Sequence, residues 1–183
     1  ANPLLKKRIV SVIGDSTFFH SGITATIDNA YNNGCGVIIV LDNRTTAMTG
    51  HQTHPGVGKT LMGNDTPDLK PEAFAAASGI KHIRVVDPYK TRILEKILRE
   101  EMERVELSFI VCRRMCVLID KNKESASSAF IDQSICKACG ACRQFGCPAI
   151  EIKDGVYSIN NILCTGCGAC VDICKFKAIG TVK

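Results

Sequence analysis

The eleven cysteines of this 183-residue chain are distributed unevenly, and eight of them form two short runs. The first run has the spacing C-x2-C-x2-C-x4-C-P and the second C-x2-C-x2-C-x3-C, and their members are Cys136, Cys139, Cys142 and Cys147, then Cys164, Cys167, Cys170 and Cys174. Three closely spaced thiolates with a more distant fourth are typical of ligands to a cubane iron–sulfur cluster. The spacing therefore predicts one-electron chemistry on two [4Fe-4S] clusters.

In such paired runs, the fourth cysteine of each run binds the other cluster. We therefore assign Cys136, Cys139, Cys142 and Cys174 to one cluster, and Cys147, Cys164, Cys167 and Cys170 to the second. Two other interpretations of the cysteine runs are less favoured. Zinc sites usually have two pairs of ligands rather than triplets, and disulfides need an oxidising compartment. The first run has one extra residue before its last cysteine, and Lys175 stands where a second proline is expected. Because of this insertion, a [3Fe-4S] cluster or a perturbed cluster is an alternative to a regular [4Fe-4S] cluster.

A second group of polar residues follows two apolar runs near the start of the chain. Gly14 and Asp15 come directly after the first run, and Asn43 and Thr45 come after the second. Gly14 lets backbone approach a diphosphate closely, while a carboxylate, an amide and an exposed backbone carbonyl are oxygen ligands that suit Mg²⁺. The two strand ends together therefore favour a magnesium diphosphate site.

The loop after the second apolar run contains Gly58-Lys59-Thr60, which resembles the end of a phosphate-binding loop. That motif requires a glycine five residues before Gly58, where this chain has Thr53, and it must open a helix directly after a strand. We therefore reject ATP or GTP binding at this segment. His51 and His54 in the same loop are candidates for proton transfer near neutral pH.

Apolar runs and helical periodicity alternate through the first two thirds of the chain. The predicted strands are 8–13, 37–41, 81–86 and 107–112, and the predicted helices are 20–33, 70–78 and 87–104. The last helix carries Ile93, Leu94, Ile97 and Leu98 on one face. Alternation of this kind predicts a parallel sheet with helices on both faces, whose ligands bind at the carboxyl ends of the strands.

The polar run at 120–128 is a predicted linker between an α/β domain at 1–119 and a small α+β domain of the two-cluster ferredoxin type at 129–183. Within the second domain, "EIKDGVYSI" predicts a hairpin with Asp154-Gly155 at its turn. The formal charge is +5 before any cluster is counted, and the basic residues lie apart from aromatic residues and from any recognition helix. We therefore expect no nucleic-acid partner.

The segments "VIGDSTFFHSGI" and "VLDNRTTAMTGHQTHPG", followed by the twin cysteine runs, resemble the C-terminal portion of the large (alpha) subunits of indolepyruvate ferredoxin oxidoreductases. These belong to the thiamine diphosphate-dependent 2-oxoacid:ferredoxin oxidoreductases. The resemblance implies that Asp15, Asn43 and the Thr45 carbonyl hold Mg²⁺, and that Gly14, Ser16 and Thr49 lie near the diphosphate. Ser16 departs from the glycine that usually ends the family's GDG motif.

The resemblance implies thiamine diphosphate-dependent oxidative decarboxylation of a 2-oxoacid, an aryl pyruvate such as indolepyruvate, to an acyl-coenzyme A. Electrons would pass through the clusters to external ferredoxin. The first half of the thiamine domain and the pyrimidine-binding domain are absent, so we expect a split or truncated subunit whose active site needs further segments or subunits, including a beta subunit. The alternative is a non-catalytic electron-transfer subunit with a docking domain. No apolar run spans a bilayer and no signal segment is present, which predicts a cytoplasmic protein.

Overall fold

The computed structural model describes residues 9–120 and 128–181, which fall into two compact units. One unit comprises Ala1–Pro88 with Ile93–Ile119, and the other Tyr89–Arg92 with Asp120–Lys183. Of the linker predicted at 120–128, residues 121–127 lie outside the described part of the chain. The two units are described separately.

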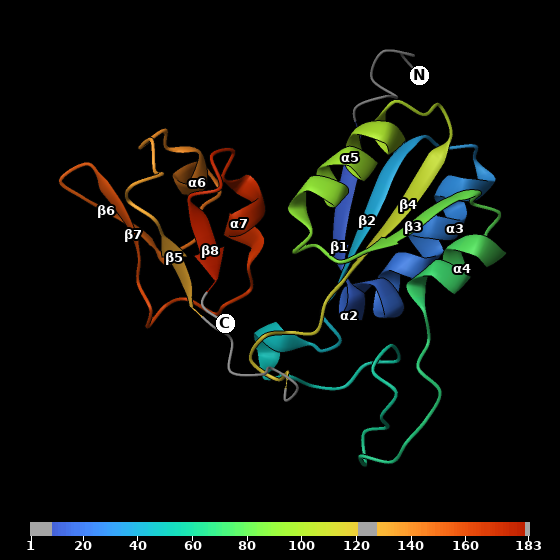
Figure 1. Cartoon of the computed structure of the whole chain (residues 1–183). Helices are drawn as coiled ribbons and strands as arrows, with labels where there is room; N and C mark the ends of the chain where they lie inside the picture. The colour runs from blue at the N-terminus through green and yellow to red at the C-terminus, as the bar shows by residue number, and fades with distance from the viewer. Residues whose placement is uncertain (1–8, 121–127, 182–183) are drawn as a thin grey trace. The chain divides into compact units, whose positions relative to one another are not determined.

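The first unit is built on a four-stranded parallel sheet (Figure 1). Its strands are β1 (Val10–Gly14), β2 (Gly36–Asp42), β3 (His82–Val86) and β4 (Leu107–Arg113), in the order β1-β2-β4-β3. The apolar runs of β2 and β4 are buried almost throughout, because both strands are central and covered on both faces. The parallel sheet predicted from the sequence is confirmed.

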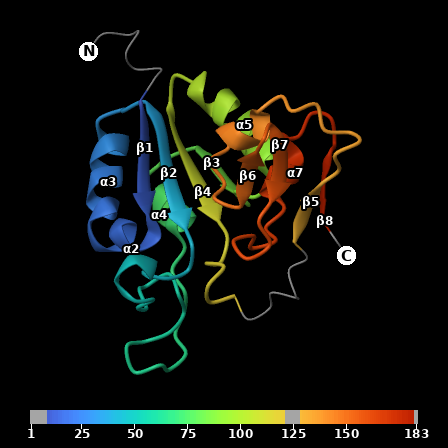
Figure 2. The same cartoon turned by 90° about the vertical axis from the view of Figure 1, so that its left-hand side faces the viewer.

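Helices cover both faces of this sheet (Figure 2). A continuous helical segment runs through α2 (Asp15–Thr17), a π-helical turn η1 (Phe18–Gly22) and α3 (Ile23–Tyr31), and it packs with α4 (Pro71–Ala77) on one face. Helix α5 (Thr91–Met102) covers the other face through Leu94, Ile97 and Leu98. None of the helices in the described part of the chain is long and apolar enough to cross a membrane.

Two helix starts differ from the prediction. The first helical segment begins at Asp15 rather than at His20, because Gly14 is the N-cap and Asp15 already lies in the first turn. Helix α5 begins at Thr91 rather than at Asp87, since a turn intervenes after Pro88. Ile93, predicted on the buried face of that helix, is 51% exposed, whereas its neighbour Leu94 packs on the sheet.

A buried carboxylate ties the end of α5 to the sheet. The Glu101 side chain is fully buried and accepts hydrogen bonds from Arg84 Nε (3.0 Å), Arg104 Nε (2.6 Å) and Ser108 Oγ (2.8 Å). Burial raises the pKa of Glu101, but these three donors outweigh it and the net pKa lies below the ordinary value. Glu101 is therefore ionised in the folded chain at neutral pH.

Replacing Glu101 by alanine should lower the free energy of unfolding of the chain by about 3 kcal/mol, because the guanidinium groups lose their buried partner. Urea unfolding followed by circular dichroism measures this change. The exposed Glu95 on the same helix is the control, and its replacement should cost about 0.5 kcal/mol or less. Because the pKa of Glu101 is lower in the folded chain than in the unfolded chain, its ionised form stabilises the folded state at pH values above the unfolded pKa. The difference in the free energy of unfolding between wild type and Glu101→Gln should therefore shrink as the pH falls below about 4.3. An unchanged difference at acidic pH would contradict this role.

One edge of the sheet is less well covered. Among the residues that the structure describes, strand β1 pairs with β2 alone. Val10, Val12 and Gly14 stand opposite Val37, Ile39 and Leu41, on the face that α5 covers elsewhere. Here Val12 is 60% exposed and Leu41 48%. We refer to Val10, Val12 and Leu41 as the open face of β1.

The second unit contains two small antiparallel sheets and two short helices. Strand β5 (Ala129–Ile131) pairs with β8 (Ile179–Thr181), and β6 (Ile150–Lys153) pairs with β7 (Val156–Ile159). The hairpin β6–β7 turns at Asp154 and Gly155, whose φ angles are 50° and 79°, so the predicted hairpin is confirmed. Helices α6 (Ala141–Gln144) and α7 (Ala169–Ile173) each begin inside a cysteine run, after Gly140 and Gly168 in the left-handed conformation.

Candidate functional site

The carboxyl ends of β1 and β2 lie side by side and join the residues predicted to bind magnesium. Gly14 at the end of β1 stands opposite Leu41 in β2. The Asp15 carboxylate accepts a hydrogen bond from Ser16 N at Oδ1 (2.8 Å) and one from Arg44 N at Oδ2 (2.9 Å). The second bond links the two strand ends across 29 residues of sequence.

Asp15 is held in its ionised form although only 3% of it is exposed. His54 Nε2 lies 3.1 Å from Asp15 Oδ2. Burial raises the pKa of Asp15, but the contact with His54 and the N–H groups of Ser16 and Arg44 outweigh it, so the net pKa is below the ordinary value. A buried anion at this sheet edge suits a divalent cation.

The loop after β2 is folded back on itself around Asn43 and Thr45. Asn43 Oδ1 accepts a hydrogen bond from Thr45 N (3.1 Å), and its carbonyl oxygen accepts one from Cys116 N (3.0 Å). The Thr46 hydroxyl donates to Ser16 Oγ (2.9 Å), which draws this loop onto the start of α2. The bonds from Arg44 and Thr46 thus hold the loop that contains Asn43 and Thr45 against Asp15 and Ser16.

The space around Gly14 fits a ligand that approaches the backbone. A Cβ added at Gly14 would meet no atom within 4 Å, so the chain leaves open room beside the start of α2. Thr49, also predicted near the diphosphate, lies on the exposed turn η2 (Ala47–Thr49), and its hydroxyl donates to Gln52 Oε1 (2.6 Å). His51 is exposed as well, with a left-handed φ of 62°.

A group of ion pairs that the sequence did not reveal braces these loops. Arg113, at the end of β4, donates to Asp42 Oδ2 (2.6 Å) and makes a bidentate pair with Glu72 in α4 (2.9 and 2.7 Å). Arg44 binds Asp68 at 2.5 Å. The partners of Arg113 lie 71 and 41 residues away in the sequence, so no local pattern could have indicated these pairs.

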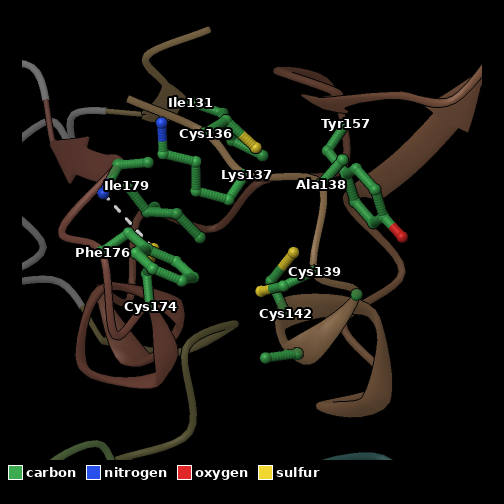
Figure 3. Close-up of a pocket in the computed structure, with 13 residues that line it drawn as sticks. Ile131, Cys136, Lys137, Ala138, Cys139, Cys142, Tyr157, Cys174, Phe176 and Ile179 are labelled. Carbon is green, nitrogen blue, oxygen red and sulfur yellow. Dashed lines mark hydrogen bonds between the residues drawn. The ribbon is translucent and has the colours of Figure 1, made fainter. Parts of the chain in front are cut away.

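Four cysteines of the second unit line one cavity (Figure 3). They are Cys136, Cys139, Cys142 and Cys174, the set that we assigned to one cluster. Figure 3 shows the sulfurs of Cys139 and Cys142 close together, with Cys136 across the cavity from them. In the described part of the chain no three ligand side chains close around a single ion, and these thiols border an open space instead.

The other four cysteines also lie near one another. Burial, together with the nearby charges of Cys167, Cys147 and Cys164, raises the pKa of Cys170 to about 11. A cluster bound here would hold all four as thiolates. The chain therefore places Cys147 of the first run with three cysteines of the second run, while the ligand sets themselves remain our prediction.

Backbone N–H groups point at two of the predicted ligand sulfurs. Cys164 Sγ accepts from Ala129 N (3.5 Å) and Gly166 N (3.4 Å), and Cys174 Sγ accepts from Ala178 N (3.3 Å). Hydrogen bonds of this kind stabilise thiolates and raise the reduction potentials of iron–sulfur clusters. Both cysteine groups thus fit a cluster in number and polarity.

The first unit has a counterpart in a known protein family. Residues 1–112 match the model of the C-terminal TPP binding domain of thiamine pyrophosphate enzymes. This chain belongs to the thiamine pyrophosphate enzyme family. As a thiamine pyrophosphate enzyme it carries an additional module, since residues 128–175 match the model of a 4Fe-4S dicluster domain. The two matches confirm the fold class predicted for each part of the chain.

Curated relatives agree with the resemblance found in the sequence. The indolepyruvate oxidoreductase subunit IorA of Methanothermobacter thermautotrophicus is 36% identical over 174 residues, which cover 94% of this chain and 28% of the relative. The IorA subunits of Archaeoglobus fulgidus and Pyrococcus horikoshii are 32% and 35% identical over 98% and 97% of this chain, and over 30% and 28% of their own length. This chain thus spans under a third of the relatives that it matches.

Proposed function

We propose that this chain supplies the magnesium and diphosphate site and the electron relay of an enzyme that oxidatively decarboxylates a 2-oxoacid. The observation that carries this proposal is that one chain joins the Asp15–Asn43 sheet edge to two groups of four cysteines. An oxidation that releases electrons singly needs both parts. The first organises the cofactor and the second leads the electrons away.

In the proposed site, Asp15, Asn43 and the Thr45 carbonyl provide the oxygen ligands of Mg²⁺. Gly14 and Ser16 line the position of the diphosphate, next to open space at Gly14. When bound, thiamine pyrophosphate supplies the electron sink that permits decarboxylation of a 2-oxoacid. The chain's own contribution is to bind and orient, because Asp15 is a buried, ionised oxygen ligand fixed by two backbone N–H groups.

The eight cysteines of the second unit form the proposed relay. The first set is Cys136, Cys139, Cys142 and Cys174, and the second is Cys147, Cys164, Cys167 and Cys170. When bound, each [4Fe-4S] cluster takes up one electron at a time. Each proposed set takes three cysteines from one run and its fourth from the other, so neither site could be built from one run alone. Hydrogen bonds to Cys164 and Cys174 favour the reduced state.

The proposed substrate is an aryl pyruvate, because the matched relatives are named indolepyruvate oxidoreductases. Coenzyme A would accept the acyl group, and an external ferredoxin would accept the electrons. The remaining segments of the enzyme and a beta subunit would complete the substrate pocket. We place the protein in the cytoplasm, since all eleven cysteines are unpaired and a reducing compartment preserves such thiols.

The test is the composition and activity of the full-length protein purified without oxygen together with its native partners. We expect thiamine pyrophosphate with magnesium, and about eight iron and eight sulfide per chain with a broad band near 400 nm. Addition of indolepyruvate and coenzyme A should reduce ferredoxin faster than addition of pyruvate. Iron without thiamine pyrophosphate would instead support a non-catalytic electron-transfer subunit, and stoichiometric zinc would contradict the relay.

A further inference from the structure

His54 belongs to the loop that follows β2, and none of its side chain is exposed. Its Nδ1 accepts a hydrogen bond from Gly56 N (3.1 Å). A ring nitrogen that accepts from a backbone N–H carries no proton itself, so the neutral imidazole must carry its proton on Nε2. The contact with Gly56 therefore makes Nε2 of His54 a donor.

That donor faces Asp15. Nε2 lies 3.1 Å from Asp15 Oδ2, but its N–H is not aligned well enough for a regular hydrogen bond. Nε2 has no other partner among the described residues. The contact between His54 and Asp15 is thus a close electrostatic one, made in a setting that excludes water.

The imidazole ring of His54 has little freedom to turn away. It stacks on Phe19, with ring centroids 5.7 Å apart and an interplanar angle of 27°. A Cβ at Gly56 would come within 2.5 Å of the Phe19 ring and 3.0 Å of the His54 ring, so glycine alone fits between them. Two independent contacts thus fix the ring that faces Asp15.

A count of lone pairs shows what this contact does to the carboxylate. Each carboxylate oxygen offers two lone pairs. Oδ2 of Asp15 faces both Arg44 N at 2.9 Å and His54 Nε2 at 3.1 Å, whereas Oδ1 accepts only from Ser16 N at 2.8 Å. Oδ1 therefore has one donor against it where Oδ2 has two, and Oδ1 is the oxygen more available to a cation.

We propose that His54 is a positioning residue for Asp15: its Nε2–H lies against Oδ2 and leaves Oδ1 as the oxygen that would be available to Mg²⁺. This inference rests on the proposed function of the sheet edge as a magnesium and thiamine pyrophosphate site. It differs from the proton-transfer role that the sequence suggested for His54, since the ring is buried against a carboxylate. Groups that orient a metal ligand in this way change metal affinity by roughly 10- to 100-fold.

To test the inference, the bound cofactor and metal are first removed from the full-length protein. Thiamine pyrophosphate is then added to saturation, and Mg²⁺ is titrated in. His54→Phe retains a ring against Phe19 but removes the donor, and it should weaken the apparent Mg²⁺ affinity by roughly 10- to 100-fold. His54→Gln restores an N–H donor and should recover part of that loss. His82→Asn, in β3 and outside the proposed site, is the control and should match wild type.

The thermal unfolding midpoint of each cofactor-free variant separates orientation from packing. Equal Mg²⁺ affinity of His54→Phe and wild type would overturn the role of His54. The role of His54 would also be overturned if the Phe and Gln variants lost Mg²⁺ affinity equally and both had a lower unfolding midpoint. That pattern would mean that His54 only supports the packing of the loop. Failure of the wild type itself to bind Mg²⁺ with thiamine pyrophosphate would instead overturn the proposed function.

Discussion

Replacement of Asp15 by alanine is expected to abolish retention of thiamine pyrophosphate and to leave the iron and sulfide content unchanged. Asp15 is the only formally charged ligand proposed for the cation, so its loss should weaken Mg²⁺ binding by roughly two orders of magnitude or more. It also removes the acceptor of Ser16 N and one of the two acceptors of Arg44 N. Cofactor and metal contents of the purified full-length variant give the measurement.

Two further variants separate the charge of Asp15 from its hydrogen bonds. Asp15→Asn keeps an acceptor oxygen but removes the negative charge, and it should lose the cofactor nearly as completely as the alanine variant. Asp28→Ala removes an exposed carboxylate from α3 and should bind the cofactor normally. Normal retention in Asp15→Asn would mean that Asp15 only braces the two strand ends.

A Cys147→Ser variant is expected to lower sustained ferredoxin reduction by orders of magnitude. Cys147 belongs to the first run but lies with Cys164, Cys167 and Cys170. Because ligation and folding are coupled in so small a module, the loss of one ligand should disturb both clusters. The measurements are the iron content, the spectrum of each cluster and the steady-state rate of ferredoxin reduction.

The same variant should retain the chemistry assigned to the other unit. In the assembled enzyme it should still bind the 2-oxoacid and release some CO₂ on a first turnover, since thiamine pyrophosphate is held elsewhere. Cys35→Ser, outside both runs, is the control and should reduce ferredoxin at the wild-type rate. Full ferredoxin reduction by Cys147→Ser would show that electrons leave by another route.

The sequence predicted those features that local patterns determine. The runs of apolar residues located all four parallel strands, and the turn at Asp154-Gly155 was correct because a left-handed pair of residues is recognisable from its types. The start of the first helix was misplaced, since Gly14 caps it without any side-chain signal. The assignment of the eight cysteines to two clusters stays a prediction.

Contacts between distant segments could not be read from the sequence. The contact of Asp15 with His54 joins the start of α2 to the loop after β2. The ion pairs of Arg113 join β4 to β2 and α4. Such contacts depend on strand order, and a central β4 between β2 and β3 was not indicated by any local pattern. The residue types of Asp15 and His54 alone are therefore not enough to predict that the two side chains meet.

The open face of β1 has a consequence for how the protein behaves in solution. A parallel sheet is normally covered on both faces, yet here Val10 and Val12 of β1 and Leu41 of β2 are exposed, and the outer edge of β1 pairs with no strand among the described residues. An edge of this kind recruits any extended segment that reaches it, including the same edge of a second molecule. Where this edge is left bare, the unit should therefore associate with itself as its concentration rises.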